Sequence, residues 1–530
     1  MSLNLRTLGV LIVIVSISSL VSADKDFYRA AVLELAQFAD LSYSPSEVAQ
    51  RNLKLYETAV TAAATDQADI IVFPESGLFP LLKINRSVAL ELSENIPNPK
   101  LDAYNPCKEN YLTDIHPILT KLSCLAKENG IFVVANIIDR KNCEFSQFCD
   151  ANDSSDFCSE NSVDCPDDGN IYFNTNVVFN RKGLLVAKYY KRHLYFEPDM
   201  RTSDYPGNVY FATDFGNFTT AICFDLVYKD LVDAVNKPEI ANVAFSTNWL
   251  NHLPFFYFSI PIQQAFAIAN SVNVLASNVN NPRVSLGSGI YSGDRGALIY
   301  SLTPDRRTKL LIANVPKVVG GPRKEIVTNA KRFIIREKSA VEDATDEKGI
   351  PLTDDCTTEV LVKLTDKYTD FRCSPPVQNT FEFIKLEGNR GDLEVCSGSF
   401  CCSLSYEATS MDEEYFLVYS ANPLTFQDSY EQASEACFVA CCEEVGNVPC
   451  RNYKLHSYTV FQKIHLKGNF STQYVYPFVV DSGIRLTERD SWQFKGKREI
   501  IYQNVNSNSS IIFIGLHGRI FDEDKEHLQE

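Results

Sequence analysis

The sequence predicts a layered α/β domain over residues 24–320 and a mostly β, disulfide-rich domain over residues 321–530. In the first part, apolar strand-like runs alternate with helical stretches, which is the order of a layered α/β fold. In the second part, charged linker-like stretches give way to strand-like pieces, and more than half of the 16 cysteines lie there. A chain of 530 residues also exceeds what one hydrophobic core usually holds, so two domains are expected.

The N-terminal elements follow from apolar density and from one helix-start signal. Residues 27–36 are dense in apolar side chains, as in a strand covered on both faces. Ser44 is followed by a proline and, three positions on, by Glu47, so a capping box predicts that a helix starts here. The next strand, residues 68–73, ends just before Glu75. This strand–helix–strand order supports a layered α/β domain.

The middle of the first domain predicts a helix and three strands. A helix ends at Gly130, and residues 131–139 form a buried strand. Residues 170–180 and 183–191 form a hairpin-like pair, and the second strand of that pair delivers Lys191.

A polar loop between Cys143 and Cys165 holds two more cysteines, Cys149 and Cys158. A metal site would usually carry a pair of cysteines with two residues between them, and no such pair occurs in this loop. We therefore predict a loop held by disulfide bonds and no metal.

The strand that ends at Cys223 is followed by further helices and strands in alternation. Residues 227–237 predict a helix and residues 241–249 a buried strand. Residues 261–273 predict another helix, and residues 273–279 another strand. Later strand-like pieces of the second domain are residues 380–387, 414–420, 458–468 and 511–521.

Three chemically distinctive side chains follow strands of the first domain: Glu75, Lys191 and Cys223. Reactive groups in α/β sheets collect at the carboxyl ends of strands. A carboxylate, an ammonium and a thiol placed there make a base, an oxyanion stabiliser and a nucleophile. Taken singly, the thiol could be half of a disulfide and the lysine a surface charge.

The residues around these groups resemble a family. FPE at 73–75, YYKRHLYFE at 189–197 and CFD at 223–225 resemble the Glu–Lys–Cys triad of the nitrilase, or carbon–nitrogen hydrolase, superfamily. The flanks STNWLNHLP at 246–254 and LGSGIY at 286–291, with NVLASNV between them, resemble its vanin and biotinidase branch. The resemblance implies a nitrilase-type αββα sandwich followed by a vanin-type β-rich domain.

The resemblance also implies roles for the residues. Glu75 is expected to be the base, Lys191 the oxyanion stabiliser and Cys223 the nucleophile. Glu197 is expected to support Lys191, with a loop-surface acid as the alternative, and the backbone N–H of Phe224 is the expected second oxyanion donor. The substrate pocket is expected to include Asn248, Trp249 and His252, although Trp249 could equally be core packing.

The predicted reaction is hydrolysis of a linear amide of a small molecule through a cysteine thioester, without metal or organic cofactor. Pantetheine, giving pantothenate and cysteamine, is the preferred substrate, because the loop 251–258 is aromatic and apolar with no clear cluster of partners for a ureido group. The alternatives are biotinidase-like hydrolysis of biocytin and a secreted binding glycoprotein without turnover. Nothing in the sequence predicts the oligomeric state.

Residues 1–23 have the three-part pattern of a secretory signal peptide. A membrane anchor is the weaker interpretation, because the apolar run is shorter than a membrane-spanning helix needs. The cysteine content fits an oxidising compartment, and the charged C-terminal tail lacks a GPI signal, so a secreted, extracellular form without a transmembrane segment is expected. The net charge of −17 argues against nucleic acid or an anionic membrane surface as a partner. Five glycosylation sequons are predicted, at Asn85, Asn152, Asn217, Asn469 and Asn508.

The cysteine count carries one more prediction. With Cys223 set aside as a reactive thiol, an odd number of cysteines remains, and these cannot all pair within one chain. Cys124, in a helix-like segment, is the expected unpaired and inert cysteine.

Overall fold

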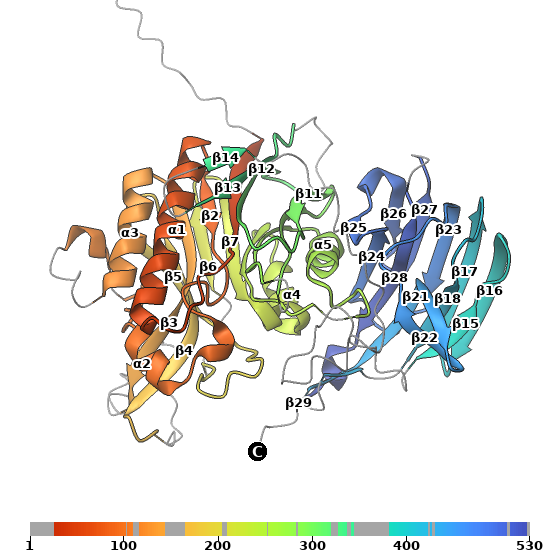
Figure 1. Ribbon diagram of the computed structural model, residues 1–530, viewed down its shortest axis with the longest axis horizontal. Coiled ribbons are helices and arrows are strands. Elements are labelled where there is room, and N and C mark those ends of the chain that lie inside the picture. The colour runs from red at the N-terminus through yellow and green to blue at the C-terminus, as the bar shows by residue number, and fades with distance from the viewer. Residues whose placement is uncertain are drawn as a thin grey trace, which may run out of the picture.

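The computed structural model describes thirteen segments of the chain, and Figure 1 shows them in stacked layers. The segments are residues 26–101, 103–109, 116–143, 165–203, 209–251, 253–281, 285–319, 327–336, 341–343, 381–421, 424–426, 430–505 and 509–526. From left to right in Figure 1, helices cover a sheet, a second sheet with its own helices follows, and the C-terminal sheets come last. The predicted signal peptide, residues 1–23, lies outside the described residues.

The first sheet has eight strands in the order β14-β13-β12-β1-β2-β3-β4-β5. Its strands are β1 Phe27–Glu34, β2 Ile70–Val72, β3 Phe132–Asn142, β4 Asn170–Phe179, β5 Leu185–Tyr190, β12 Thr308–Pro316, β13 Lys331–Ile335 and β14 Val341–Asp343. β1, β2 and β3 run parallel, and β4 and β5 form the predicted antiparallel pair.

Helices α1 Pro45–Thr65, α2 Arg86–Leu92 and α3 Pro117–Asn129 cover the outer face of this sheet. Ser44 and Glu47 form the predicted capping box of α1, and Gly130, in the left-handed conformation at φ 62°, ends α3. Such a φ suits glycine because it has no Cβ to clash.

The second sheet has six strands in the order β11-β10-β9-β8-β7-β6. Its strands are β6 Tyr210–Thr213, β7 Gly216–Ile222, β8 Asn242–Ser246, β9 Asn273–Ser277, β10 Ser288–Ser292 and β11 Gly296–Ser301. Helices α4 Lys229–Val235 and α5 Ser259–Asn270 pack on its outer face.

The two sheets pack face to face through alternate side chains of their strands. In β1, Ala30 and Val32 enter the core between the sheets, whereas Ala31 and Leu33 face the helices. A strand buried on both faces is apolar at most positions. Arg29 and Glu34 are the charged exceptions in β1, and both are buried. The two sheets and their covering helices, including β13 and β14 beyond residue 320, therefore form the αββα sandwich that the resemblance implied.

The C-terminal part is a sandwich of two antiparallel sheets beside α5. The larger follows the order β15-β18-β21-β28-β24-β25 with β22 paired to β21, and the smaller is β16-β17-β23-β27-β26. A small sheet of β19, β20 and β29 completes it. The strands are β15 Glu382–Lys385, β16 Arg390–Ser397, β17 Phe400–Ala408, β18 Tyr415–Ser420, β19 Leu424–Phe426, β20 Tyr430–Gln432, β21 Ser434–Val445, β22 Val448–Tyr453, β23 Phe461–Gly468, β24 Val475–Asp481, β25 Arg485–Leu486, β26 Trp492–Lys495, β27 Glu499–Gln503, β28 Ile511–Arg519 and β29 Lys525–Glu526.

Disulfide bonds lie in both parts of the molecule. They join Cys107 to Cys124, Cys143 to Cys165, Cys396 to Cys401, Cys402 to Cys437 and Cys442 to Cys450. The prediction that Cys124 is unpaired is wrong, because the short helical turn Pro106–Lys108 brings Cys107 against α3. Within the described segments the free thiols are Cys223 and Cys441, both buried.

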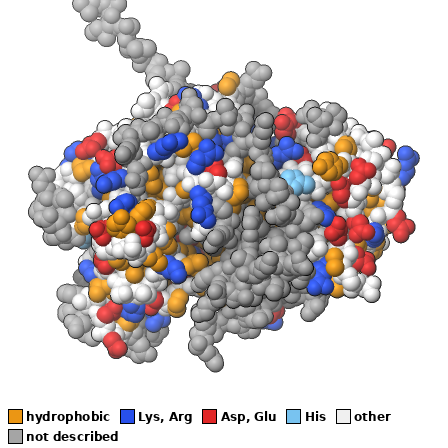
Figure 2. Space-filling model, viewed as in Figure 1, with side chains coloured by type: hydrophobic (Ala, Val, Ile, Leu, Met, Phe, Trp, Pro, Cys, Tyr) orange, Lys and Arg blue, Asp and Glu red, His pale blue; other side chains and the backbone are white. Residues whose placement is uncertain are grey.

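The surface carries the remaining predicted features. Lysine and arginine side chains are interspersed with aspartate and glutamate on the face shown in Figure 2. Asn85 and Asn469 are exposed, and Asn217 is half-buried in β7. The sequons Asn152 and Asn508 lie outside the described residues. Among the helices that the structure describes, none combines the length and apolar character needed to cross a membrane.

Candidate active site

The three candidate groups follow three strands of the two facing sheets. Glu75 lies just past β2, Lys191 directly follows β5, and Cys223 directly follows β7. β2 and β5 belong to the first sheet and β7 to the second. The face-to-face packing of the sheets therefore brings the groups together.

Lys191 forms the centre of a buried ion cluster. Its Nζ donates to Glu75 Oε1 at 2.7 Å and also to Glu197 Oε1. Burial alone would lower the pKa of Lys191, but the carboxylates of Glu197 and Glu75 outweigh it and hold that pKa well above its ordinary value. The ammonium is therefore charged in the folded protein.

Glu75 is fully buried and accepts hydrogen bonds on both oxygens. Asn174 Nδ2 donates to Oε1 at 2.8 Å, beside Lys191, and the Asn248 N–H donates to Oε2 at 2.9 Å. Burial raises the pKa of Glu75, Lys191 opposes that shift, and the nearby Glu197 adds to it. A carboxylate with a raised pKa is a better proton acceptor than one in water.

Cys223 opens a short 3₁₀ turn, η5 Cys223–Val227, in a left-handed conformation with φ 45°. Burial, with a further contribution from Glu75, raises the pKa of its thiol, while Lys191, the Thr247 hydroxyl and the Asn248 N–H act in the opposite direction. The resting sulfur is therefore a neutral thiol. For such a thiol to attack a carbonyl, a base would have to take the proton as the bond forms.

Asp225 connects the turn that carries Cys223 to the segment that carries Lys191. Its Oδ1 accepts from the N–H groups of Arg192 at 3.2 Å and His193 at 3.0 Å. Its Oδ2 accepts from the Ile222 N–H at 3.0 Å and the Tyr189 hydroxyl at 2.8 Å. One buried carboxylate thus fixes the backbone on both sides of the site.

Of the two supporting residues predicted from the sequence, Glu197 lies in the ion cluster and Phe224 directly follows Cys223 in the chain. Glu197 contacts Lys191 through Oε1 and accepts from Asn174 Nδ2 at 2.7 Å through Oε2. Phe224 is the second residue of η5, and N–H groups at the start of a helical turn point out of its N-terminal end. That direction suits an oxyanion donor, and the role stays a prediction.

The predicted pocket residues have more varied positions. Asn248 contacts Glu75 through its backbone, as described above. Trp249 is buried, and its indole Nε1 donates to the Tyr257 carbonyl at 2.9 Å. His252 lies outside the described residues. Farther along the same loop, Phe255 and Phe256 are buried against aromatic rings of the C-terminal domain, so these two rings serve packing between the domains.

Sequence reasoning missed the amides that hold the acids in place. Asn174 bridges Glu75 and Glu197, and its own Oδ1 accepts from Asn136 Nδ2 at 2.7 Å. Asn136 Oδ1 in turn accepts from the Ser76 N–H at 2.8 Å. Polar residues in the middle of buried strands were the available signal, because such groups need partners inside the protein.

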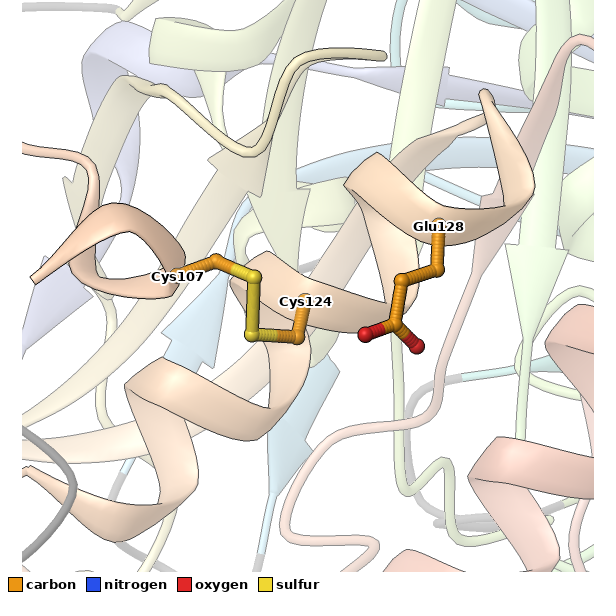
Figure 3. A group of neighbouring side chains, drawn as sticks. All are labelled: Cys107, Cys124 and Glu128. Carbon is orange, nitrogen blue, oxygen red and sulfur yellow. A yellow bond between two sulfur atoms is a disulfide. The ribbon is translucent and has the colours of Figure 1, made fainter. Parts of the chain in front are cut away.

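One cluster in the described residues has the spacing of a metal site, and Figure 3 shows why it is not one as it stands. It consists of Cys107, Cys124 and Glu128, with ligand atoms within 4.8 Å of one another. The two sulfurs are joined in a disulfide, so neither is a thiolate ligand.

Comparison with known proteins gives two family matches and relatives along most of the chain. Residues 29–321 match the carbon–nitrogen hydrolase family, and residues 374–524 match the vanin C-terminal domain. A biotinidase of Mus musculus is 30% identical, covering 96% of each chain. A pantetheinase of Bos taurus is 30% identical, covering 94% of this chain and 90% of its own. Among solved structures, an amidase from Nesterenkonia sp. is 15% identical with a TM-score of 0.38, covering 56% of this chain and 93% of that one.

Proposed function

The chain belongs to the carbon–nitrogen hydrolase family and carries a vanin C-terminal domain, and from this premise we propose a secreted amidase that uses Cys223 as its nucleophile. The observation that carries the proposal is the buried contact of Lys191 with Glu75 and Glu197, beside a neutral thiol. Burying three charges is costly, and a purely apolar cluster would often be more stable. A need for chemistry accounts for keeping them.

The proposed reaction begins with attack of the Cys223 sulfur on the amide carbonyl carbon while Glu75 takes the thiol proton. Lys191 and the Phe224 N–H stabilise the negative oxygen that develops. Collapse breaks the carbon–nitrogen bond, and Glu75 returns the proton to the leaving amine. Water, deprotonated by Glu75, then attacks the thioester, releases the acid and restores the thiol.

Pantetheine is the proposed substrate, with biocytin as the second candidate. A site for the biotin ureido group needs buried donors and acceptors in a fixed pattern. In the loop predicted to line the pocket, the polar side chains of Asn251 and Tyr257 are used within the protein. Asn251 bonds Ser259 N at 2.7 Å and the Leu286 carbonyl at 3.0 Å, and the Tyr257 hydroxyl donates to Gln432. This pairing favours the pantothenoyl group, whereas the biotinidase relatives support biocytin equally with the pantetheinases.

The test is to compare kcat/KM for cysteamine release from pantetheine with kcat/KM for lysine release from biocytin. A preference for pantetheine is expected. A clear preference for biocytin would overturn the substrate and leave the amidase mechanism standing. Hydrolysis of neither, with Cys223 open to alkylation, would favour another amide or a binding role.

Secretion is part of the proposal and has its own test. Residues 1–23 are proposed to be removed, and the exposed sequons Asn85 and Asn469 to carry glycans. N-terminal sequencing of protein from the medium should begin at Asp24, and endoglycosidase treatment should lower its mass. Protein retained in cells with residue 1 intact would contradict this.

A further inference from the structure

The turn that presents Cys223 is contacted by one side chain of the C-terminal domain. Arg519, at the end of β28, donates from Nη2 to the Val227 carbonyl oxygen at 3.3 Å. Val227 closes the η5 turn that Cys223 opens. The Arg519 side chain is 3% exposed, so this hydrogen bond is made away from water. Breaking it would leave a buried carbonyl without this donor.

The guanidinium of Arg519 is held in place from several directions. Nη1 donates to the Ala433 carbonyl at 2.6 Å and to Asp524 Oδ1 at 3.0 Å, while Nη2 donates to Asp524 Oδ2 at 2.6 Å. Its central carbon lies 4.9 Å from the centre of the Phe521 ring. A planar guanidinium fixed in this way is a directional donor and not a mobile surface charge.

The turn needs such support because of its backbone. Cys223 is a non-glycine residue at φ 45°, a conformation that costs free energy and persists only where neighbouring groups enforce it. Asp225 holds the start of the turn through the Ile222 N–H. Arg519 holds its end, and just beyond it Lys229 pairs with Asp522 of the C-terminal domain at 3.0 Å.

β28 also supports the loop that follows Asn248, the residue whose N–H donates to Glu75. Phe256 stacks on His517, two residues before Arg519, with ring centres 4.6 Å apart and planes 9° apart. The neighbouring Tyr257 accepts the indole N–H of Trp249, which follows the residue that donates to Glu75. β28 therefore contacts both segments that frame the site.

We propose that Arg519 is a positioning residue for Cys223, through which the C-terminal domain sets the geometry of a site that lies wholly in the hydrolase layers. The inference rests on the proposed role of Cys223 as nucleophile. Arg519 does not touch the reacting atoms. It fixes the carbonyl at the end of the turn, and thereby the direction of the sulfur and of the Phe224 N–H.

The experiment compares Arg519→Met, Arg519→Lys and, as a control, Lys525→Met in the full-length chain. Lys525 lies in the same terminal segment and pairs with Glu431 at the surface, away from the turn. Two measurements are made on each variant: hydrogen exchange of the peptide covering residues 222–230, and kcat and KM for amide hydrolysis.

In Arg519→Met, faster exchange in this peptide is expected, with kcat lowered roughly 10- to 100-fold and KM little changed, because small misplacements of a nucleophile act on the chemical step. Arg519→Lys should recover part of the protection from exchange and part of kcat, and Lys525→Met should match wild type in both measurements. Unchanged exchange and kcat in Arg519→Met would overturn the inference.

Should Arg519→Met fail to fold, Arg519→Lys and Asp524→Asn decide the question. Asp524→Asn keeps the guanidinium and weakens its hold, so intermediate exchange and kcat are expected, and wild-type values in both variants would overturn the inference. Exchange does not depend on turnover. An active Cys223→Ala would therefore count against the nucleophile alone, whereas unchanged exchange in Arg519→Met counts against the positioning role alone.

Discussion

The two thiols that the described structure leaves free, Cys223 and Cys441, are both buried but have different surroundings. Burial raises the pKa of both, that of Cys441 to about 12. Cys441 lies within β21 of the C-terminal domain, opposite Tyr415 of β18. Cys223 lies past the end of its strand, beside a lysine that is paired with the proposed base.

Charged side chains lie near both thiols, but their hydrogen-bond and ion-pair partners differ. Near Cys441, Glu413 accepts from Ser457 and from both the N–H and the hydroxyl of Thr459, and Lys454 pairs with Glu443. Near Cys223, the carboxylate and the ammonium are paired with each other. Burial therefore does not distinguish a nucleophile from a structural thiol. Our proposal that Cys223 is the nucleophile depends instead on the proton acceptor, Glu75, that is paired with the ammonium of Lys191.

The largest expected effect is on turnover. Cys223→Ala should abolish amide hydrolysis while secretion continues, because a buried thiol exchanged for a methyl group loses little volume. Cys441→Ala should keep the wild-type kcat/KM. Assays of secreted protein with matched concentrations measure both, and residual activity of Cys223→Ala within about tenfold of wild type would contradict the assignment.

Alkylation by iodoacetamide should separate the two thiols in the native protein. The thiolate is the reactive form, and a thiol with pKa about 12 is ionised only to about 1 part in 10⁴ at pH 8, so Cys441 should react slowly and faster as the pH rises. The pKa of the Cys223 thiol is raised further than that of Cys441, so by pKa alone Cys223 would react more slowly still, but the proposed base Glu75 can take its proton during attack. Peptide mapping should find Cys223 labelled first, and Glu75→Gln should remove that preference. Equal labelling of the two thiols in native protein would break the comparison, and unfolded protein is the control.

Loss of the cation should weaken the site without removing the thiol. Lys191→Ala should lower kcat by about 10²–10³ or more, because an oxyanion donor and the stabilisation of developing thiolate charge are both lost. It should also lower the free energy of unfolding by about 3–5 kcal/mol, since two buried carboxylates lose their counter-ion. Lys188, buried in the strand that Lys191 follows and paired with Asp139, is the matched control: its alanine variant should lose stability but keep kcat in the folded fraction.

The smallest effect is expected at the carboxylate that joins the two sides of the site. Asp225→Asn should lower kcat by about tenfold with little change in KM, because an amide nitrogen cannot accept the N–H bonds that one oxygen now accepts. Asp230→Asn is the control, since Asp230 bonds the side chains of Arg192 and His193. Equal loss in both variants would mean that Asp225 acts through the stability of the segment and not through alignment.

Much of the hydrolase fold was predictable because its signals are local. The capping box at Ser44 and the glycine end of α3 depend on neighbouring residues, and the apolar strands depend on their own composition. The partner of Cys124 was not predictable. Disulfide pairing depends on which segments meet in space, and the meeting of Cys107 with α3 is a tertiary contact.

In the candidate site, too, some residues could be predicted from local signals and others could not. Glu75, Lys191 and Cys223 were predictable because each follows the carboxyl end of a strand, where reactive groups collect in α/β sheets, and because each lies in a family motif. Asn174 was hidden inside a strand, where a polar residue has no distinctive spacing. Arg519 was hidden by distance along the chain, since its contact with Val227 joins residues of different domains.

The position of β28 has a consequence for how the protein is made. It is synthesised after β21 and β24, yet it lies in the interior of its sheet, between those two strands. The ribosome therefore completes the residues that we propose for the chemistry roughly three hundred residues before the strand that bears Arg519. A nascent chain would carry its thiol, lysine and acids through the synthesis of those residues without the contact from Arg519, and the proposed site would gain this support only after β28 had emerged and joined its sheet.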